Sequence, residues 1–314
     1  MAYAKGKHSV KKKQKLNKQK VKLIALPIVL SLGIFIGYKE VSNAFSSTVG
    51  YASPKTVELS KELLESKYPV IQKLIDLAPV YPKIYEILKN PSEYPPEFLV
   101  MASKKPETID FVADFVNHKG GQTEVSTPVE GSYTKGEIPL YMQWDERWGY
   151  DKYGPDYFAI NGCGPTALSM VAVGLTGNEN LSPKYIENFS VKNGYLVDGV
   201  GTAWSLMTDG AKKLGLKGKV IPLSASIIIS NLEKGNPVIA TMGPGHFTTE
   251  GHYIVLTGVT DDGKIIVNDS DSKERSSKTW DVDVFLKKLK MYGHLAFKSN
   301  TYIDLYKKKL IQLN

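Results

Sequence analysis

The chain of 314 residues has little of what metal and disulfide chemistry requires. It contains one cysteine, Cys163, and five histidines. A single cysteine cannot form a disulfide within the chain, and it cannot supply the paired thiolates of a structural zinc site. The sequence also lacks the His-Glu-x-x-His pattern of zinc peptidases. We therefore expect no metal and no cofactor.

Two further kinds of binding loop are incomplete. The segment 261–271 is acidic, but Lys273 stands where a calcium loop would need another ligand. Gly199 and Gly201 lack the third glycine and the preceding strand of a dinucleotide-binding loop. Neither a calcium site nor a dinucleotide site is predicted.

Acidic residues are absent from the first 22 positions, which hold nine lysines. The formal net charge is +8, with 40 basic and 32 acidic residues in all. Removing the nine lysines leaves 31 basic residues against the same 32 acidic ones, so the remainder is nearly neutral. A nucleic-acid-binding domain would spread its positive charge over a folded surface. We expect no nucleic-acid partner.

The one long apolar run, residues 23–38, directly follows this basic tail. As a helix its 16 residues would span about 24 Å, against about 30 Å for a bilayer core. Lys22 and Lys39 could extend its reach by placing their charges at the interface. We predict a cytoplasmic tail (1–22), a single membrane anchor (23–38) and an extracellular remainder. The alternative is secretion after signal cleavage behind Ala44 or Ala52.

Export gives the lone cysteine a particular meaning. Exported domains commonly use cysteines in pairs, so an odd one forms an intermolecular bond or is a reactive thiol. Gly162 and Gly164 flank Cys163, and Pro165 suits the first turn of a helix. Backbone N–H groups at a helix start would stabilise a thiolate there. The alternative is a buried structural cysteine.

The residues after Cys163 repeat with helical spacing. Their apolar members predict an amphipathic helix that ends at Gly174 and Gly177: Leu168, Val171, Ala172 and Leu175. A cysteine nucleophile at such a helix start needs a base within hydrogen-bond reach. His252 is the best candidate, because it opens a predicted strand, 252–257, that places it on one face with Ile254 and Leu256.

The group that orients this base depends on strand register. A four-residue loop, 260–263, between strands 252–257 and 264–268 places Asp269 opposite Ile254 and diagonal to His252. A five-residue loop would deliver Asn268 to that face instead. We favour Asp269 and leave Asn268 as the alternative.

Oxyanion donors complete the predicted site. The backbone N–H of Cys163 is one candidate, and the side-chain amide of Gln143 is the other. His246 is a rival base that we interpret as cleft lining, because it lies in a glycine-rich loop. The other predicted cleft residues are Met242, Phe247 and Trp204.

Prolines and apolar patterns divide the exported part. Residues 54–118 predict a region of short helices, residues 119–136 a Gly/Ser/Thr-rich linker, and residues 301–314 a terminal segment. The short helices are expected at 57–66, 69–77, 81–89, 96–102 and 106–117. Between the linker and the terminal segment, residues 137–300 predict an α+β domain. Its further helices are expected at 201–214, 225–234 and 281–291, and its strands at 237–242, 252–257 and 264–268.

Four motifs occur in order over residues 138–300: Gln143-Trp-Asp, Gly162-Cys-Gly-Pro-Thr, Gly251-His-Tyr-Ile-Val-Leu and Val267-Asn-Asp. Together they resemble papain-fold cysteine peptidases of the bacteriocin-processing (double-glycine) peptidase-like family, in its secreted stand-alone branch. Residues 94–112 resemble a helical segment that precedes this domain in secreted members. The resemblance implies a nucleophile helix packed on an antiparallel sheet. It also implies Cys163 as nucleophile, His252 as base, Asp269 as third member and Gln143 in the oxyanion hole.

The function expected from these features is an extracytoplasmic cysteine peptidase. It would cleave peptide or isopeptide bonds, with peptides or cell-wall peptides as substrates, and contact the membrane through its anchor. The alternatives are a surface binding module on an inactivated peptidase fold and a thiol acyltransferase acting on cell-wall peptides. No apolar run long enough for transport follows residue 300, so we expect no transport by this chain. Oligomeric state and the role of region 54–118 stay open.

Overall fold

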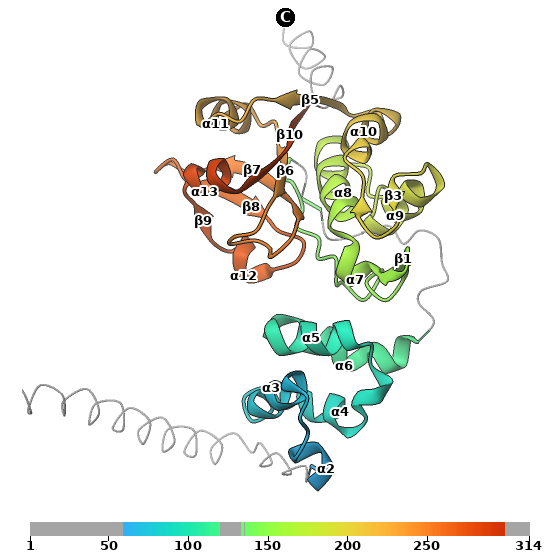
Figure 1. Ribbon diagram of the computed structural model, residues 1–314. Coiled ribbons are helices and arrows are strands. Elements are labelled where there is room, and N and C mark those ends of the chain that lie inside the picture. The colour runs from blue at the N-terminus through green and yellow to red at the C-terminus, as the bar shows by residue number, and fades with distance from the viewer. Residues whose placement is uncertain (1–58, 120–132, 135, 299–314) are drawn as a thin grey trace, which may run out of the picture. The chain divides into compact units, whose positions relative to one another are not determined.

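Several helices in the first part of the chain begin with proline. The computed structural model describes residues 59–119, 133–134 and 136–298 (Figure 1). Its first elements are α2 (Lys61–Leu64), α3 (Pro69–Leu77), α4 (Ile84–Lys89), η1 (Pro91–Glu93), α5 (Pro96–Lys104), η2 (Pro106–Thr108), α6 (Ile109–Asp114) and η3 (Phe115–His118). The helix predicted at 69–77 is confirmed with the same bounds, because Pro69 fixes its first turn. The helix expected at 106–117 is instead three short pieces.

Several expectations fall on other residues. The tail, the anchor at 23–38, most of the linker and the segment 301–314 lie outside the described residues. Within the part of the chain that is described, no helix has the length and apolarity needed to cross a bilayer.

Aromatic packing joins the helical region, residues 59–119, to the segment that follows the linker. Phe111 stacks on Tyr150 with ring centroids 4.3 Å apart, and Phe98 lies 4.7 Å from Tyr157. The hydroxyl of Tyr150 donates to the carbonyl of Phe111 at 2.7 Å. These residues belong to one buried apolar cluster, within one compact unit that begins at Leu59. The helical region is therefore packed against the domain that follows it.

A six-stranded antiparallel sheet forms the centre of the second part. Its strand order is β5-β10-β6-β7-β8-β9. The strands are β5 (Lys217–Ile221), β6 (Val238–Met242), β7 (His252–Val259), β8 (Ile265–Asn268), β9 (Thr279–Trp280) and β10 (Leu289–Lys298).

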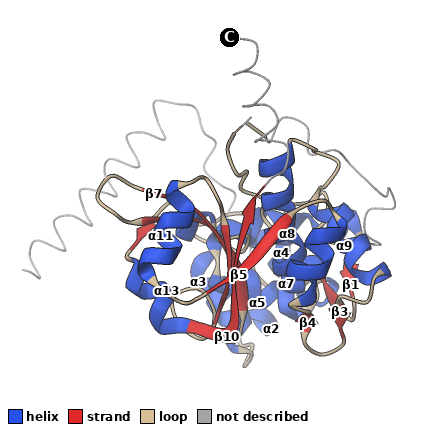
Figure 2. Ribbon diagram, turned by 90° about the horizontal axis from the view of Figure 1, so that it is seen from above, coloured by secondary structure: helices blue, strands red, loops and turns tan. Residues whose placement is uncertain are grey.

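Helices cover both faces of this sheet (Figure 2). Helix α8 (Cys163–Thr176) packs on one face, where Ile239 and Val255 share its apolar cluster. Helices α11 (Ala225–Glu233) and α13 (Val282–Lys288) pack on the other face against Ala240, Ile254 and Leu256. Alternate strand residues thus enter opposite layers, as the pleat of a strand requires. The structure confirms the α+β expectation.

Short elements surround α8. They are β1 (Lys152–Tyr153), β2 (Asp156–Tyr157), α7 (Phe158–Asn161), α9 (Pro183–Lys192), β3 (Leu196–Val197), β4 (Gly201–Thr202), the π-helical turn η4 (Leu206–Gly210) and α10 (Ala211–Lys213). The helix predicted from 201 to 214 was therefore wrong in its first turn. Gly201 has a φ of 95°, which a right-handed helix excludes, and it pairs in the β3–β4 hairpin.

The strands at the other end of the sheet were not predicted. The helix expected at 281–291 ends at Lys288, and β10 begins at the next residue. Strand β5 shows no alternation, since four of its five residues are exposed. Both strands are defined by distant partners: His294 pairs with Ile221 on one side and with Ala240 on the other. Such pairing leaves little local signal in the sequence.

Candidate active site

Cys163 is the first residue of α8, as the sequence predicts. Its side chain is partly exposed, whereas the rest of the first two turns is buried. Gly162 and Gly164 are required by packing: a Cβ on Gly162 would lie 2.5 Å from the Phe158 carbonyl oxygen, and one on Gly164 would lie 2.6 Å from Thr202. The two glycines thus let the helix start fit between α7 and β4. Gly177 ends the helix in a left-handed conformation, while Gly174 lies within it, contrary to expectation.

His252 is the first residue of β7, so it lies at one end of that strand. Its side chain is 7% exposed. The imidazole interacts with the Cys163 side chain, which raises the pKa of His252, and its Nε2 atom lies 2.7 Å from Oδ1 of Asp269. Since Nε2 is engaged by the carboxylate, Nδ1 is the ring nitrogen left for the sulfur. The structure therefore brings Cys163, His252 and Asp269 into one chain of interactions.

Asp269 reaches His252 through two compensating irregularities. Val259 pairs with Ile265, so the loop has five residues and not the four that were expected. That loop alone would have delivered Asn268. A bulge between Leu256 and Gly258 shifts the register back by one residue, and Val255 then pairs with Asn268. Asp269 consequently occupies the face that we predicted, for a reason that the prediction did not contain.

Asn268 points elsewhere. Its Nδ2 atom donates to the carbonyl oxygens of Ile138 and Pro139, at 2.9 and 3.0 Å. Asn268 therefore links the segment at residues 138–139 to the end of β8. Of the two residues considered as orienting groups, only Asp269 contacts the imidazole.

The buried charges stabilise one another. Burial by itself would lower the pKa of His252, but the Asp269 carboxylate and the Cys163 sulfur outweigh it and raise that pKa to about 10. Burial would raise the pKa of Asp269, but the cations of His252 and Arg275 outweigh it and lower that pKa to about 2. At neutral pH the arrangement thus favours a protonated imidazole beside an ionised carboxylate. This is the charge state that a thiolate nucleophile needs.

Gln143 holds two segments together. Its Nε2 atom donates to the carbonyl oxygens of Ala159 and Ile160, at 2.8 and 3.1 Å, and its Oε1 accepts from the Ser270 hydroxyl at 3.1 Å. Both amide hydrogens are therefore engaged by backbone carbonyls. An oxyanion would have to replace one of these acceptors, so the expected part of Gln143 in the oxyanion hole stays a prediction.

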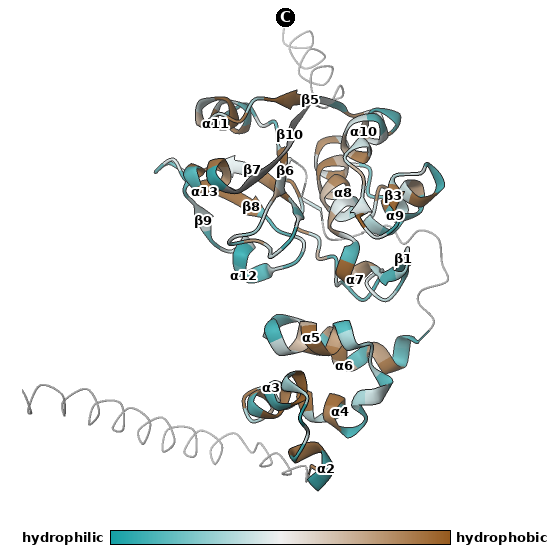
Figure 3. Cartoon of the chain, viewed as in Figure 1, coloured by the Kyte–Doolittle hydropathy of each residue, from teal (hydrophilic) through white to brown (hydrophobic). Residues whose placement is uncertain are grey.

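Arg275 was missed by sequence reasoning. Its Nε donates to Oδ2 of Asp269 at 2.6 Å, and its Nη2 lies 3.1 Å from Asp271. It lies on α12 (Lys273–Ser276), a hydrophilic turn of helix (Figure 3). The available signal was Ser272 three residues earlier, which caps this helix and returns residue 275 towards the acid.

The residues expected to share a cleft with His246 are divided between two layers. Trp204 packs beside Cys163 and stacks on Tyr253, with ring centroids 6.1 Å apart. Met242 and Phe247 are instead buried in the cluster between the sheet and α13. The physical reason is the alternation of the strands, which directs neighbouring segments to opposite faces of the sheet.

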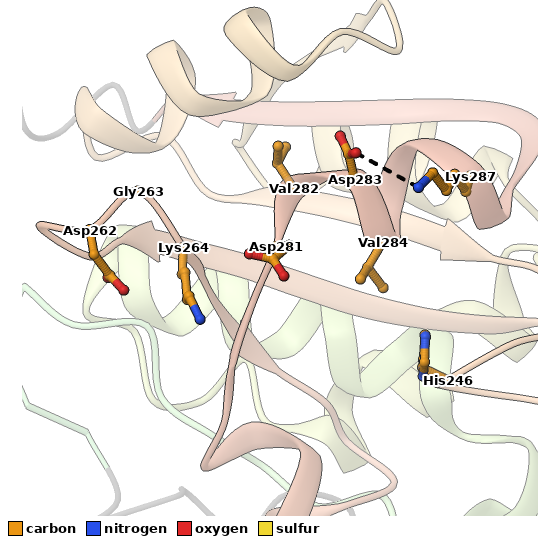
Figure 4. A pocket seen from close by; sticks show the side chains of 9 residues that line it. All are labelled: His246, Asp262, Gly263, Lys264, Asp281, Val282, Asp283, Val284 and Lys287. Atoms are coloured by element: carbon orange, nitrogen blue, oxygen red, sulfur yellow. Dashed lines mark ion pairs between the residues drawn. The ribbon is translucent and has the colours of Figure 1, made fainter.

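His246 itself is exposed and lines a different pocket (Figure 4). This pocket has a volume of about 540 Å³ and carries charges of both signs, including an ion pair of 3.7 Å between Lys287 and Asp283. Neither Cys163 nor His252 lines it. Among the residues that the structure describes, no cluster of His, Cys, Asp and Glu could hold a metal ion.

Part of this chain is similar to known proteins. A search of curated proteins gave no match. Among solved structures, the chain is similar to the peptidase domain of Streptococcus ComA, a bi-functional ABC transporter involved in a quorum sensing pathway. That similarity has 20% sequence identity and a TM-score of 0.34, and covers 45% of this chain and 93% of the other. The profile of the Peptidase_C39 like family matches residues 135–300, which is more than half of the sequence. The chain belongs to this Peptidase_C39 like family.

Proposed function

We propose that the protein is a cysteine peptidase that cleaves peptide or isopeptide bonds through a thioester intermediate. The observation that carries the proposal is the interaction of the Cys163 side chain with the His252 imidazole, whose Nε2 atom lies 2.7 Å from the buried Asp269 carboxylate. Membership of a peptidase-like family supports it. The proposed substrates are peptides or cell-wall peptides.

In the proposed mechanism the Cys163 thiolate attacks the carbonyl carbon of the scissile bond. The imidazolium of His252 gives its proton to the leaving amine, and the acyl group stays on sulfur as a thioester. The neutral imidazole then takes a proton from water, whose oxygen attacks the thioester and releases the acid and the thiol. Asp269 holds the imidazole in the required orientation throughout. The Cys163 backbone N–H at the start of α8 is placed to donate to the oxyanion.

A binding module on an inactivated fold would need no contact between thiol and imidazole. The interaction between Cys163 and His252 therefore favours catalysis over binding alone. Acyl transfer would use the same thioester and differs only in the acceptor. An added amine that appears in the product would identify it.

The proposal is tested by incubating wild type and Cys163→Ala with peptide libraries and cell-wall fragments, followed by mass spectrometry. We expect cleavage by wild type only. His246→Gln is the matched control, because that imidazole is exposed and lies outside the contact chain, and it should retain wild-type cleavage. Cleavage by Cys163→Ala would exclude the sulfur as nucleophile.

A second measurement needs no substrate. Cys163 is the only cysteine, so iodoacetamide labelling reports on this thiol alone. At pH 6 we expect Cys163 to label faster than a model thiol such as glutathione, because the imidazolium stabilises the thiolate. Labelling no faster than glutathione would contradict the proposed charge state.

We also propose that the peptidase acts outside the cytoplasm, held by residues 23–38 as a membrane anchor. The nine lysines before this apolar run support that orientation. Cell fractionation and mass spectrometry of the mature N-terminus test it. An intact N-terminus in the membrane fraction is expected, and cleavage near Ala44 or Ala52 would indicate a secreted form.

A further inference from the structure

The carboxylate of Asp269 is divided between two cations. Oδ1 contacts His252 and also accepts the backbone N–H of Asp271 at 2.9 Å, while Oδ2 accepts from Arg275. The backbone N–H of Asp269 donates to the Ser276 hydroxyl at 2.9 Å. Asp269 has no exposed surface, so its orientation depends on these partners alone. All of them except His252 come from residues 269–276, which we call the acid loop.

Arg275 makes further contacts within the acid loop and with Trp280. Its Nη2 contacts Asp271, its backbone N–H donates to the Ser272 hydroxyl at 3.1 Å, and its carbonyl accepts from Trp280 at 3.1 Å. The guanidinium thus bridges two aspartates that lie two residues apart. A planar group that donates in two directions is well suited to fix both.

The helical region supplies the remaining contacts to the acid loop. Lys105, at the end of α5, pairs with Asp271. The Glu107 carboxylate accepts from the Ser272 hydroxyl at 2.6 Å and from the backbone N–H groups of Lys273 and Glu274 at 2.8 and 3.3 Å. Glu107 therefore caps α12 from a segment about 165 positions earlier in the chain.

We propose that Arg275 is a positioning residue of the active site, and that Lys105 and Glu107 of the helical region hold the acid loop in which it acts. This inference rests on the proposed function. It assigns the helical region a part in catalysis: a continuous set of ion pairs and hydrogen bonds runs from Glu107 and Lys105 through the acid loop to His252. The region is thus a support for the triad in addition to a packing partner.

The pH response follows from the charges around Asp269. These are His252 on β7, Arg275 and Asp271 in the acid loop, Lys105 and Glu107 in the helical region, and Cys163 beyond the imidazole. Arg275 is the cation in direct contact besides His252, and it helps to keep the pKa of Asp269 low. Without it the carboxylate protonates at higher pH, and the imidazolium loses its anionic partner there. The imidazolium itself stays protonated at that acidic pH, but it is no longer held in line with Cys163, so we expect Cys163 to lose reactivity at higher pH as well.

The test measures iodoacetamide alkylation of Cys163 from pH 3 to 10 in the full chain. For Arg275→Met we expect the acidic limb of the alkylation profile to move up by about one pH unit, the effect of one neighbouring charge. On a cleaved peptide, kcat should fall roughly tenfold with KM within about twofold, because substrate binding is untouched. Arg275→Lys should recover more than half of the pH shift, since it restores the charge.

Glu107→Gln tests the helical region, because it keeps the side-chain shape and removes the charge that caps α12. We expect a smaller upward movement of the acidic limb, in the same direction. Lys278→Met is the matched control, since Lys278 is exposed next to α12 and pairs only with Glu274 among the described residues. It should leave the profile unchanged. A similar limb shift in Lys278→Met would overturn the inference, because the effect would then be one of general charge.

The outcomes separate this inference from the proposed function. A wild-type profile that rises only near the ordinary thiol pKa of about 8.5, like that of a free thiol, would contradict the thiolate–imidazolium site itself. A wild-type limb that stays in place in Arg275→Met and Glu107→Gln would overturn only the positioning role. If Arg275→Met does not fold, Arg275→Lys and Glu107→Gln decide, and an unchanged limb in both overturns the inference.

Discussion

At the scale of single residues, the two nitrogens of His252 serve different partners. Nε2 faces a carboxylate that never meets solvent, and the other nitrogen serves the thiol. The carboxylate is what keeps the buried imidazole protonated, because burial alone would favour the neutral ring. The reactivity of Cys163 should therefore depend on Asp269, although Asp269 belongs to another strand.

Asp269→Asn tests this dependence. The amide keeps a hydrogen-bonding group but removes the negative charge, so the pKa of His252 falls from about 10 towards or below its ordinary 6.5. The imidazolium is then lost at lower pH, and near pH 7 Cys163 has no cationic partner, so its alkylation should be slower than in wild type. We expect kcat/KM to fall roughly 100-fold or more. Alkylation at the wild-type rate near pH 7 would show that the carboxylate does not set the protonation of His252.

At the scale of elements, the site depends on how closely α8 approaches its neighbours. The helix starts against α7 and the β3–β4 hairpin, with glycines at both contacts. The nucleophile is partly exposed at this start because its neighbours carry no side chains, whereas residues 164–174 are all buried. The position of the sulfur is therefore set by backbone packing and not by a flexible loop.

Gly164→Ala should disturb that packing. The added methyl group would lie 2.6 Å from Thr202, so either the hairpin or the helix start must move. Overpacking of this kind costs about 1–3 kcal/mol of unfolding free energy. Urea unfolding should show that loss, together with slower alkylation of Cys163. Gly258→Ala is the control: its nearest contact is the end of the Ile266 side chain at 3.4 Å, and it should leave alkylation unchanged.

At the scale of the molecule, the helical region and the peptidase domain share a core. Phe111 lies between the two, stacked on Tyr150 and in contact with the position a Cβ on Gly149 would take. The same two parts are also joined by the polar contacts of Lys105 and Glu107. Apolar packing supplies stability to this junction, and the polar contacts fix its geometry at the acid loop.

Phe111→Ala tests whether the two parts unfold together. Removing a buried aromatic ring costs about 3–5 kcal/mol. In calorimetry of the full chain, we expect residues 59 onwards to unfold in one transition in wild type. The midpoint temperature of that transition should be lower in the variant. Val80→Ala, at a side chain that is 69% exposed, should change little. Two separate transitions in wild type would contradict the shared core.

Local patterns in the sequence were sufficient for much of the fold. Helix 69–77, the start of α8 at Cys163 and the three strands 237–242, 252–257 and 264–268 follow from prolines, glycines and apolar periodicity. Strands β5 and β10 did not follow, because both are defined by pairing with segments far along the chain. Periodicity indicates only the conformation that a segment favours by itself.

The sequence by itself determined the residue types of the candidate site and the elements that carry Cys163 and His252. Only the tertiary structure decided that Asp269, and not Asn268, contacts the imidazole, because that outcome depends on a loop length and a bulge acting in opposite directions. It also decided that Arg275 contacts Asp269 and that Lys105 and Glu107 contact the acid loop. Their contacts cross up to 167 positions of sequence, and hydrogen bonds over such distances form only when packing brings the segments together.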